Sequence, residues 1–363
     1  MAAANMSLST RVVASHRKDT LRAWEEVQSL LADFPADVLI LFCSADHALD
    51  TLADQIARTG HTVLACTSGE STTSLQVMAL YGENLALRLF AIPHLSAGPA
   101  SAQPAIEAIV DAAQHSPNGS QRVGLLLVDG LSRAEEWLAH ALYTRLPGVP
   151  FVGGSAGDNF QFERTAVYWQ GAFHTDMAVF GLFEPHSDFS LFQSELAGGR
   201  GEPMVITLAD VQRRAILQLN GLPAAEVYAA ALGVREDELT PAIWRQHPLM
   251  VKVGNDQVAR AISHIASDGA LVCLSAVDSG LIATLGEAAS QPTDIQAVIQ
   301  RAQQSVTNVA GLVLIDCALN ARSETATATE PEVPALILRS FGEQFNGQHR
   351  NASVAALVLG ASP

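Results

Sequence analysis

Lysine is almost absent from this chain of 363 residues, in which Lys18 and Lys252 are the only two. Lys and Arg together number 21 against 37 Asp and Glu, so the formal net charge is −16. No stretch of the sequence forms a basic patch. Nucleic acids and anionic membrane surfaces repel an acidic protein, so we expect neither as a partner and interpret the acidic surface as a source of solubility.

Long apolar runs are also missing. No stretch approaches the roughly 18 apolar residues of a membrane-spanning helix. Residues 1–7 show no positive region followed by an apolar core, which is the pattern of a secretion signal. We therefore expect no membrane insertion and a cytoplasmic location.

The common metal and redox motifs are missing as well. The four cysteines, Cys43, Cys66, Cys273 and Cys317, lie in or at the end of apolar runs and form no CxxC pair, which argues against a zinc site or thioredoxin-type chemistry. The absence of CxxCH excludes covalently attached c-type haem, and the absence of HExxH argues against a zincin protease. We expect buried, unreactive thiols.

The most informative feature that is present is a repeated corner. It consists of a hydroxyl residue, any residue, a glycine and a carboxylate, and it occurs at Thr67–Glu70, Ser155–Asp158 and Ser340–Glu343. Each copy ends an apolar run of strand length. Hydrophobic residues make up 48% of the chain, so there is enough apolar material for a large core around these strands.

Each corner lies at the end of the second strand of a predicted unit, in which two strands are joined by a helix or an equivalent connecting segment. The first strands of the units are residues 38–43, 123–129 and 312–317, and the strands that end at the corners are 63–66, 151–154 and 335–339. The distance from the end of the first strand to the corner differs by only a residue or two among the three units, which indicates a repeat. We expect the following strands to form hairpins around residues 81–84 and 170–171, with 355–359 as the arm of the third unit.

Residues 196–290 have a different pattern. Glycines at 198–201 indicate a flexible joint, and short apolar or alternating runs follow, separated by turns such as 254–256 and 267–269. The sequence therefore predicts an α/β fold of repeated βαβ-plus-hairpin units that form mixed sheets with outer helices, plus a mostly antiparallel inserted region. We divide the chain into an N-terminal helical segment (1–35), an α/β domain (36–195) and a second domain (196–363).

One corner contains a possible catalytic motif. Gly153–Gly157 fits GxSxG, the nucleophile elbow of α/β-hydrolases, and it follows a predicted strand. The elbow also needs a helix directly afterwards, and residues 158–164 do not form a convincing one. The other two corners lack the motif. A serine hydrolase that uses Ser155 is therefore the third of our interpretations.

The glycine and carboxylate of each corner are candidates for a ligand site. Gly69–Glu70, Gly157–Asp158 and Gly342–Glu343 lie where loops leave strand ends, the region in which open α/β sheets collect ligands. Two interpretations stay open. Either glycine supplies a positive φ and the carboxylate accepts backbone N–H groups within the turn, or these residues line a ligand cavity.

Histidine provides candidate iron ligands, because non-covalent haem needs only one axial imidazole. Five histidines lie in or beside apolar segments, and these are His94, His174, His247, His264 and His349. Spacing alone does not single out any of them, and each also suits a hydrogen-bonded core or surface position.

Several segments in combination resemble a known family. Val38–Asp50 followed by Cys66–Glu70 resembles the start of the FIST N domain, and Phe151–Asp158 with the strands up to Phe183 resembles its second half. The segments that resemble the FIST C domain are Asn220–Ala224 with Tyr228, His247–Leu249, Ser267–Leu271 and Gly342–Asn351. The resemblance covers nearly the whole chain beyond the first helix, with 36–195 similar to FIST N and 196–363 similar to FIST C.

The resemblance implies a cytoplasmic sensor domain for a small ligand, not an enzyme. One branch of the family consists of stand-alone haem proteins that sense nitric oxide and regulate a partner histidine kinase or cyclic-di-GMP enzyme. This chain looks similar to that branch, and His247 and His349, which fall within family-like motifs, are then the candidate haem ligands. The alternative is a haem-free sensor whose cavity, lined by the glycine–carboxylate corners, binds a small organic ligand.

Overall fold

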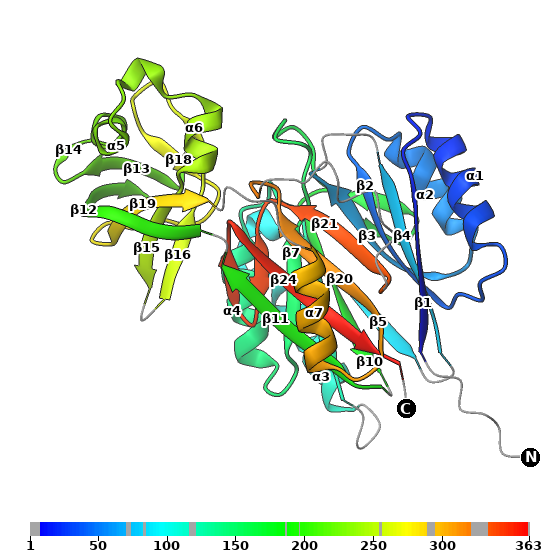
Figure 1. The fold of residues 1–363 in the computed structure, drawn as a ribbon. Coiled ribbons are helices and arrows are strands. Elements are labelled where there is room, and N and C mark those ends of the chain that lie inside the picture. Colours follow the sequence, from blue (N-terminus) through cyan, green and yellow to red (C-terminus); the bar gives the residue numbers. More distant parts are fainter. Residues whose placement is uncertain are drawn as a thin grey trace, which may run out of the picture.

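The computed structural model describes residues 8–69, 74–82, 85–115, 121–185, 187–195, 197–253, 256–288, 295–320 and 333–361. It contains an α/β body and a smaller part, rich in strands, at one side of the body (Figure 1). The smaller part comprises residues 197–288 and is called the insert below. The chain enters it after a strand of the body and re-enters the body at a helix that begins at Ile295.

The body is built from three copies of one four-stranded unit. Its strand orders are β1-β4-β2-β3, β5-β10-β6-β7 and β11-β24-β20-β21. In each copy the last two strands are parallel and the other neighbours are antiparallel. The repeat predicted from the three corners is therefore present in the fold, and the mixed α/β architecture is confirmed.

The elements of the first unit are β1 (Ser9–Ser15), α1 (Thr20–Leu31), β2 (Val38–Ser44), α2 (Leu49–Ala57), β3 (Thr62–Ser68) and β4 (Leu75–Tyr81). Those of the second are β5 (Ala86–Pro93), η1 (Leu95–Ala97), α3 (Pro99–Gln114), β6 (Val123–Val128), α4 (Glu135–Arg145), β7 (Phe151–Ser155) and β10 (Met177–Glu184). Those of the third are β11 (Phe189–Glu195), α7 (Ile295–Ser305), β20 (Val309–Cys317), β21 (Ala335–Ser340) and β24 (Ser353–Gly360).

Residues 1–35 include more than the predicted helix. The helix is present as α1, and it begins where the Asp19 carboxylate accepts the backbone N–H of Arg22. The strand β1 precedes it and pairs with β4 along its whole length. Sequence analysis missed this strand because β1 lies at the edge of its sheet and most of its residues are only half-buried, so it lacks a continuous apolar run.

Two short hairpins cross from one unit to the next. The pair β8 (Val167–Trp169) and β9 (Ala172–His174) follows β7 in sequence but extends the first sheet beside β3. The pair β22 (Glu343–Phe345) and β23 (Gln348–Arg350) follows β21 but extends the second sheet beside β7. These crossings join each unit to the preceding one.

The hairpins predicted from turn signals are only partly correct. Residues 83–84 lie outside the described residues, but the strands on either side, β4 and β5, belong to different sheets, so they are not a hairpin. The turn at 170–171 joins β8 to β9, whereas β10 pairs with β6 and β5 of the second unit. A turn signal predicts a chain reversal, but burial against other strands decides the pairing.

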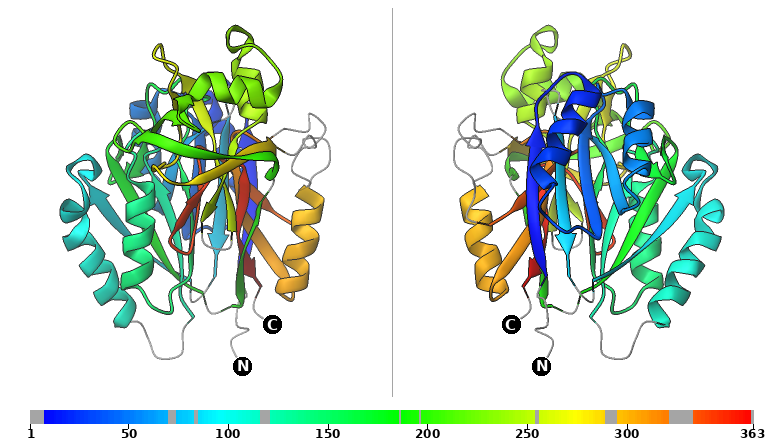
Figure 2. Two further views of the ribbon diagram at one scale, coloured as in Figure 1. Left: turned by 90° about the vertical axis from the view of Figure 1, so that its left-hand side faces the viewer. Right: turned by 90° about the vertical axis from the view of Figure 1, so that its right-hand side faces the viewer.

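The central strands are apolar throughout because both of their faces are buried. In β2, Ile40 and Phe42 contact the common core, whereas Leu39 and Leu41 on the opposite face pack beneath α1 and α2. The common core takes side chains from β2–β4, β6, β7, β10, β20, β21 and β24, so all three units contribute to it. The helices lie on the outside of this ring of strands (Figure 2).

The insert is antiparallel in all of its described strand pairs, as predicted. A core around the buried ring of Tyr228 holds its sheet against α5. Its elements are β12 (Ala197–Asp210), β13 (Ala215–Leu219), β14 (Leu222–Pro223), α5 (Ala224–Leu232), η2 (Glu236–Glu238), α6 (Pro241–Gln246), β15 (Leu249–Val253), β16 (Asp256–Arg260), β17 (Ile262–Ile265), β18 (Leu271–Cys273) and β19 (Ile282–Ala288).

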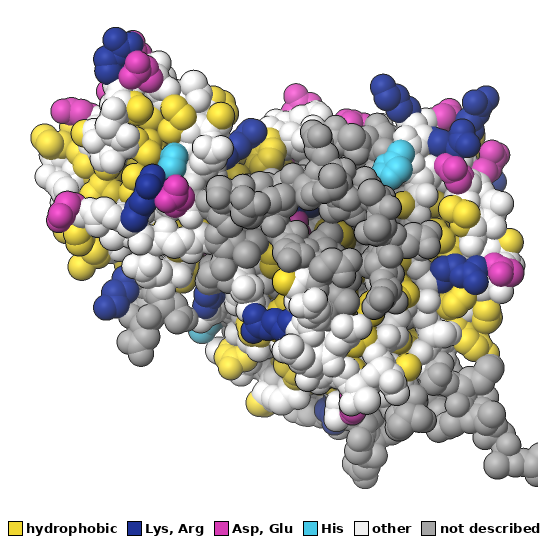
Figure 3. Space-filling view, viewed as in Figure 1, with side chains coloured by type: hydrophobic (Ala, Val, Ile, Leu, Met, Phe, Trp, Pro, Cys, Tyr) yellow, Lys and Arg dark blue, Asp and Glu magenta, His cyan; other side chains and the backbone are white. Residues whose placement is uncertain are grey.

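The surface agrees with the charge pattern of the sequence. On the face shown in Figure 3, Lys and Arg side chains are scattered among Asp and Glu and do not gather into a basic patch. Among the described residues, none of the helices has the length and apolar character needed to cross a membrane.

We predict that Gly130→Ala destabilises the body, because a Cβ at this position would overlap the carbonyl oxygen of Ala156, a backbone atom. The expected loss in free energy of unfolding is about 1–3 kcal/mol, measured by urea denaturation. Gly198→Ala is the control, since a Cβ there meets no atom within 4 Å. Equal stability of the two variants would contradict the close packing of this loop.

Candidate functional site

The three corners meet at the ends of β3, β7 and β21. The N–H of Gly69 donates to the carbonyl of Arg339 at 2.7 Å, and the N–H of Gly157 donates to the carbonyl of Thr67 at 3.1 Å. Ser155 in turn donates its N–H to Gly342 at 2.9 Å. The repeated motif therefore forms a single junction in which the three chain segments are hydrogen-bonded to one another.

The junction is packed and leaves no room for a ligand between its glycines. A Cβ on Gly157 would lie 2.7 Å from the nitrogen of Gly69. The ring of Phe341 lies over both Gly69 and Gly130. The corners thus meet, and Gly69 and Gly157 serve close backbone approach between the chain segments.

The carboxylates of the second and third corners are held within the fold. Asp158 accepts the backbone N–H groups of Phe162, Glu163 and Arg164 at 2.7–3.0 Å. Glu343 is fully buried and accepts the hydroxyl groups of Ser340 and Ser353. Both sets of contacts favour a structural role for these carboxylates over a role in lining a ligand cavity. Glu70 lies outside the described residues.

Beside the junction, Ser155, Gln344 and His349 form a buried polar chain. The amide nitrogen of Gln344 lies 3.3 Å from the carbonyl oxygen of Gly342, to which it donates, 3.0 Å from Ser155 Oγ and 2.9 Å from His349 Nδ1. Because the carbonyl can only accept, it fixes the orientation of the amide. A donor therefore faces Nδ1, so the proton of the neutral imidazole lies on Nε2.

A buried charged cluster connects the start of α4 in the body to Arg214, the residue of the insert that directly precedes β13. The guanidinium of Arg214 donates to Glu135 Oε1 at 2.8 Å and to Glu136 Oε2 at 2.7 Å. It also donates to the carbonyl oxygens of Arg133 and Leu274. Glu135 and Glu136 begin α4, where the helix dipole stabilises negative charge.

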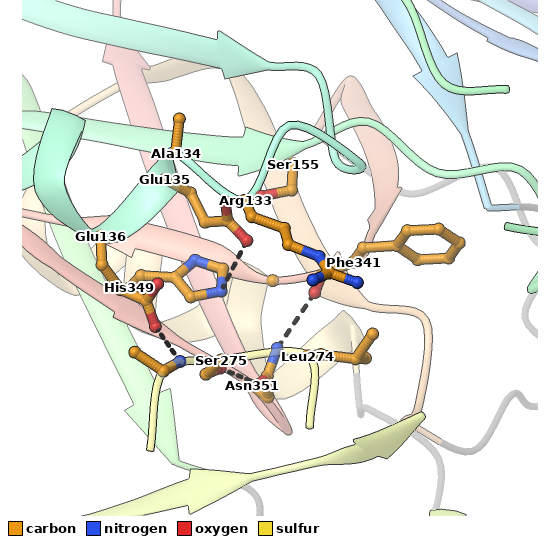
Figure 4. Close-up of polar contacts among 12 residues, drawn as sticks. Arg133, Ala134, Glu135, Glu136, Ser155, Leu274, Ser275, Phe341, His349 and Asn351 are labelled. Atoms are coloured by element: carbon orange, nitrogen blue, oxygen red, sulfur yellow. Dashed lines mark hydrogen bonds and ion pairs between the residues drawn. The ribbon is translucent and has the colours of Figure 1, made fainter. Parts of the chain in front are cut away.

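Two further contacts cross the same boundary (Figure 4). Glu136 Oε1 accepts the backbone N–H of Ala276 in the insert at 2.5 Å. The hydroxyl of Ser275 in the insert donates to the side chain of Asn351, which donates to the carbonyl of Phe341 at the third corner. We call the set Glu135, Glu136, Arg214, Gln344, His349 and Asn351 the polar joint.

The ionisation states in the polar joint follow from burial and charge. Burial lowers the pKa of His349, although the nearby Glu135 and Glu136 oppose this effect. Burial would raise the pKa of Glu135, but the positive charge of Arg214, together with the other neighbouring charges and hydrogen bonds, lowers that pKa. At neutral pH the joint therefore holds an ionised carboxylate and a neutral imidazole.

Three buried polar atoms of the joint lack a hydrogen-bond partner within the described part of the chain. They are Glu135 Oε2, Gln344 Oε1 and His349 Nε2. His349 Nε2 lies 3.8 Å from Glu135 Oε1, which is too long for a hydrogen bond. Buried polar atoms without partners are rare in folded proteins and are costly. Their clustering marks the joint as the candidate functional site.

The predicted haem ligands do not form one site. The residues around His349 do not fit a haem, because its side chain is fully buried, Nδ1 faces Gln344, and Cε1 packs against Gly342. His247 follows α6 in the insert, where its Nδ1 lies 3.2 Å from the carbonyl of Gly286 and its own carbonyl accepts from Tyr228. These contacts anchor His247 within the insert. Haem binding therefore remains a prediction from family resemblance.

The geometry of Ser155 gives no support to a nucleophile. Its side chain is buried and Oγ lies next to the Gln344 amide, a donor. The imidazole of His349 contacts the same amide nitrogen through Nδ1, and its Nε2 faces Glu135 (Figure 4). A nucleophilic serine needs a base within hydrogen-bond reach.

Comparison with known proteins defines the family. The model of the FIST N domain matches residues 37–222, and the model of the FIST C domain matches residues 224–346. The chain belongs to the FIST family. FIST domains are small-ligand sensor domains of signalling proteins. The boundary between the two matches falls inside the insert, within β14 and directly before α5.

No curated protein matches this chain. Among solved structures, a cyanuric acid hydrolase from A. caulinodans is similar at 9% identity, with 98% of this FIST chain and 99% of the hydrolase covered and a TM-score of 0.34. A TM-score this low supports no inference about fold or activity.

Sequence reasoning placed His349 among the candidates but missed Glu135, Glu136, Arg214 and Gln344. Glu135 and Glu136 carry a weak signal, since paired acids at the start of a helix are common. Arg214 carries none, because it comes from the insert and nothing in the local sequence connects it with α4.

We predict that Arg214→Met lowers the free energy of unfolding by about 3–5 kcal/mol, because it leaves the buried carboxylate of Glu135 without its counter-charge. Urea denaturation measures the change. The neighbouring Arg213→Met is the matched control, since Arg213 pairs with Asp268 at an exposed position, where a loss below about 1 kcal/mol is expected. Similar losses in both variants would contradict the role of the buried cluster.

The lowered pKa of His349 predicts a pH dependence. Below pH 6.5, the ordinary pKa of histidine, the unfolded chain takes up this proton before the folded chain does. Stability should therefore fall as the pH drops from 6.5 through the folded pKa. His349→Gln should reduce this slope in urea denaturation, while His47, whose pKa is also lowered by burial, keeps its own share. An unchanged slope would contradict the prediction.

Proposed function

We propose that this FIST protein is a haem-independent sensor in which a small ligand binds between the body and the insert and changes how the insert is held. The observation that carries the proposal is the polar joint, where three buried polar atoms lack partners at the boundary between the two parts. Ligands commonly bind at such boundaries, and polar interfaces between domains permit relative motion.

The contacts across the boundary suit a two-state element. Arg214 and Ala276 both depend on the carboxylate of Glu136, so a change in this one side chain releases two contacts of the insert. A ligand shifts such an equilibrium only if it binds the two states with different affinity. A ligand that supplies hydrogen-bond partners for the unpaired atoms in only one state would provide that difference in affinity.

The proposal is a sensor and not an enzyme, as the family resemblance implies, and the surroundings of Ser155 support this choice. Ser155 has an amide donor, not a base, as its neighbour. Haem, nitric oxide, a regulated histidine kinase or cyclic-di-GMP enzyme, and a cytoplasmic location stay predictions of the family resemblance, and an absorption spectrum with added haem tests the first.

A metabolite screen by thermal shift, combined with hydrogen exchange, tests the sensor function. A ligand that binds only the folded state raises the melting temperature. With such a ligand, we expect the exchange rate of the Ala276 amide to change, because this N–H bonds to Glu136 across the boundary.

Glu136→Gln is the coupling variant, since it keeps the shape of the side chain and removes its charge. We expect it to keep the thermal shift and to reduce the change in exchange at Ala276. Ligands that raise the melting temperature without changing exchange in the insert would show binding without signal transfer and would contradict the proposal.

A further inference from the structure

The loop after the second corner holds two aromatic rings in a strained backbone. The Asp158 carboxylate accepts three N–H groups of residues 162–164 and so fixes the loop. Asn159, Phe160 and Phe162 have φ values of 56°, 59° and 55°. Bulky residues rarely adopt this left-handed region, and such strain gathers at functional sites.

The two rings cover the third corner. The ring centroids of Phe160 and Phe162 lie 5.5 Å and 5.2 Å from the ring centroid of Phe341, and the ring planes make angles of 30° and 36° with that of Phe341. Phe341 is buried, whereas Phe160 and Phe162 are only half-buried. The strained loop therefore presents partly open aromatic surface directly over the point where the three units meet.

A cation from the insert completes the arrangement. Arg245, at the end of α6, places its guanidinium carbon 4.1 Å from the centroid of Phe160. It is half-buried and, within the described part of the chain, its side chain has no carboxylate partner. A guanidinium stacked on an aromatic ring keeps its planar fork of N–H donors, which suits a carboxylate.

We infer that Phe160, Phe162 and Arg245 form a binding site for a small planar acid, an aromatic or heteroaromatic ring that carries a carboxylate. The ring of the ligand packs against Phe162 and the edge of Phe160, because Arg245 lies over the face of Phe160, and its carboxylate pairs with the Arg245 fork. This inference rests on the proposed function, because it names the ligand class for the same boundary. Aromatic stacking favours flat ligands, and the fork distinguishes an acid from a neutral analogue.

The arrangement also explains how a ligand bound at this site affects the insert. The rings belong to the body and the guanidinium belongs to the insert. The affinity for a ligand that contacts both therefore depends on the distance between body and insert. Phe341 connects the two sites directly, since its ring packs with Phe160 and its carbonyl accepts from Asn351 of the polar joint.

Calorimetric titration with indole-3-carboxylate tests the site. The comparison probes are indole-3-carboxamide, which is flat but neutral, and cyclohexanecarboxylate, which is acidic but not flat. We expect saturable binding of indole-3-carboxylate and at least about tenfold weaker binding of both analogues, since a charged hydrogen-bonded pair corresponds to about this factor or more.

Three variants assign the binding to the named residues. Arg245→Gln should weaken indole-3-carboxylate binding about tenfold or more, and Arg245→Lys should lie in between because it keeps the charge and loses the fork. Phe162→Leu should weaken binding of both indole probes. Arg235→Gln is the matched control, an exposed arginine of the insert that pairs with Asp237, and it should bind like the unmodified chain.

Each contrary outcome is distinct. Absence of saturable binding of indole-3-carboxylate overturns the ligand class, and the metabolite screen then still decides the sensor function. Equal affinity in Arg245→Gln overturns the site. If indole-3-carboxylate binds as expected but exchange at Ala276 stays unchanged, the site stands and the sensor function fails.

Discussion

The hydrogen bonds among the three corners are the constraint on which the rest of the structure depends. Each unit is a four-stranded sheet whose inner face is apolar, and one sheet cannot bury that face alone. The corners hold the ends of β3, β7 and β21 together through backbone groups, with glycines where the segments touch. The junction also positions Gln344 and Phe341, which belong to the third corner and the hairpin after it.

The boundary with the insert follows a different physical rule. The body is held by apolar burial, whereas the insert is tied to it by buried charges and polar side chains around Arg214. Buried ion pairs are poor sources of stability but depend strongly on geometry. A boundary of this kind suits a part that has to move, and it separates the stable core from the element that would carry a signal.

Much of the fold was predictable because it is encoded locally. The matched spacing from strand to corner identified three units, and the alternating runs after residue 196 identified the antiparallel insert. The edge strand β1 and the partners of β4 and β10 were not predictable, because half-buried edges lack a pattern and turn signals do not specify distant partners. Of the candidate site, only Gln344, His349 and Asn351 lie in a segment that carries a family-like motif.

Local sequence specifies the repeated unit and the corner with its glycine, since each depends on residues close together in the chain, and composition alone specifies the acidic character. The tertiary structure alone establishes that the corners form one packed junction. It also decided that Arg214 meets Glu135 and that Arg245 meets Phe160. Such contacts arise when whole units and the insert bury their surfaces against one another, and the spacing of residues within one segment does not predict them.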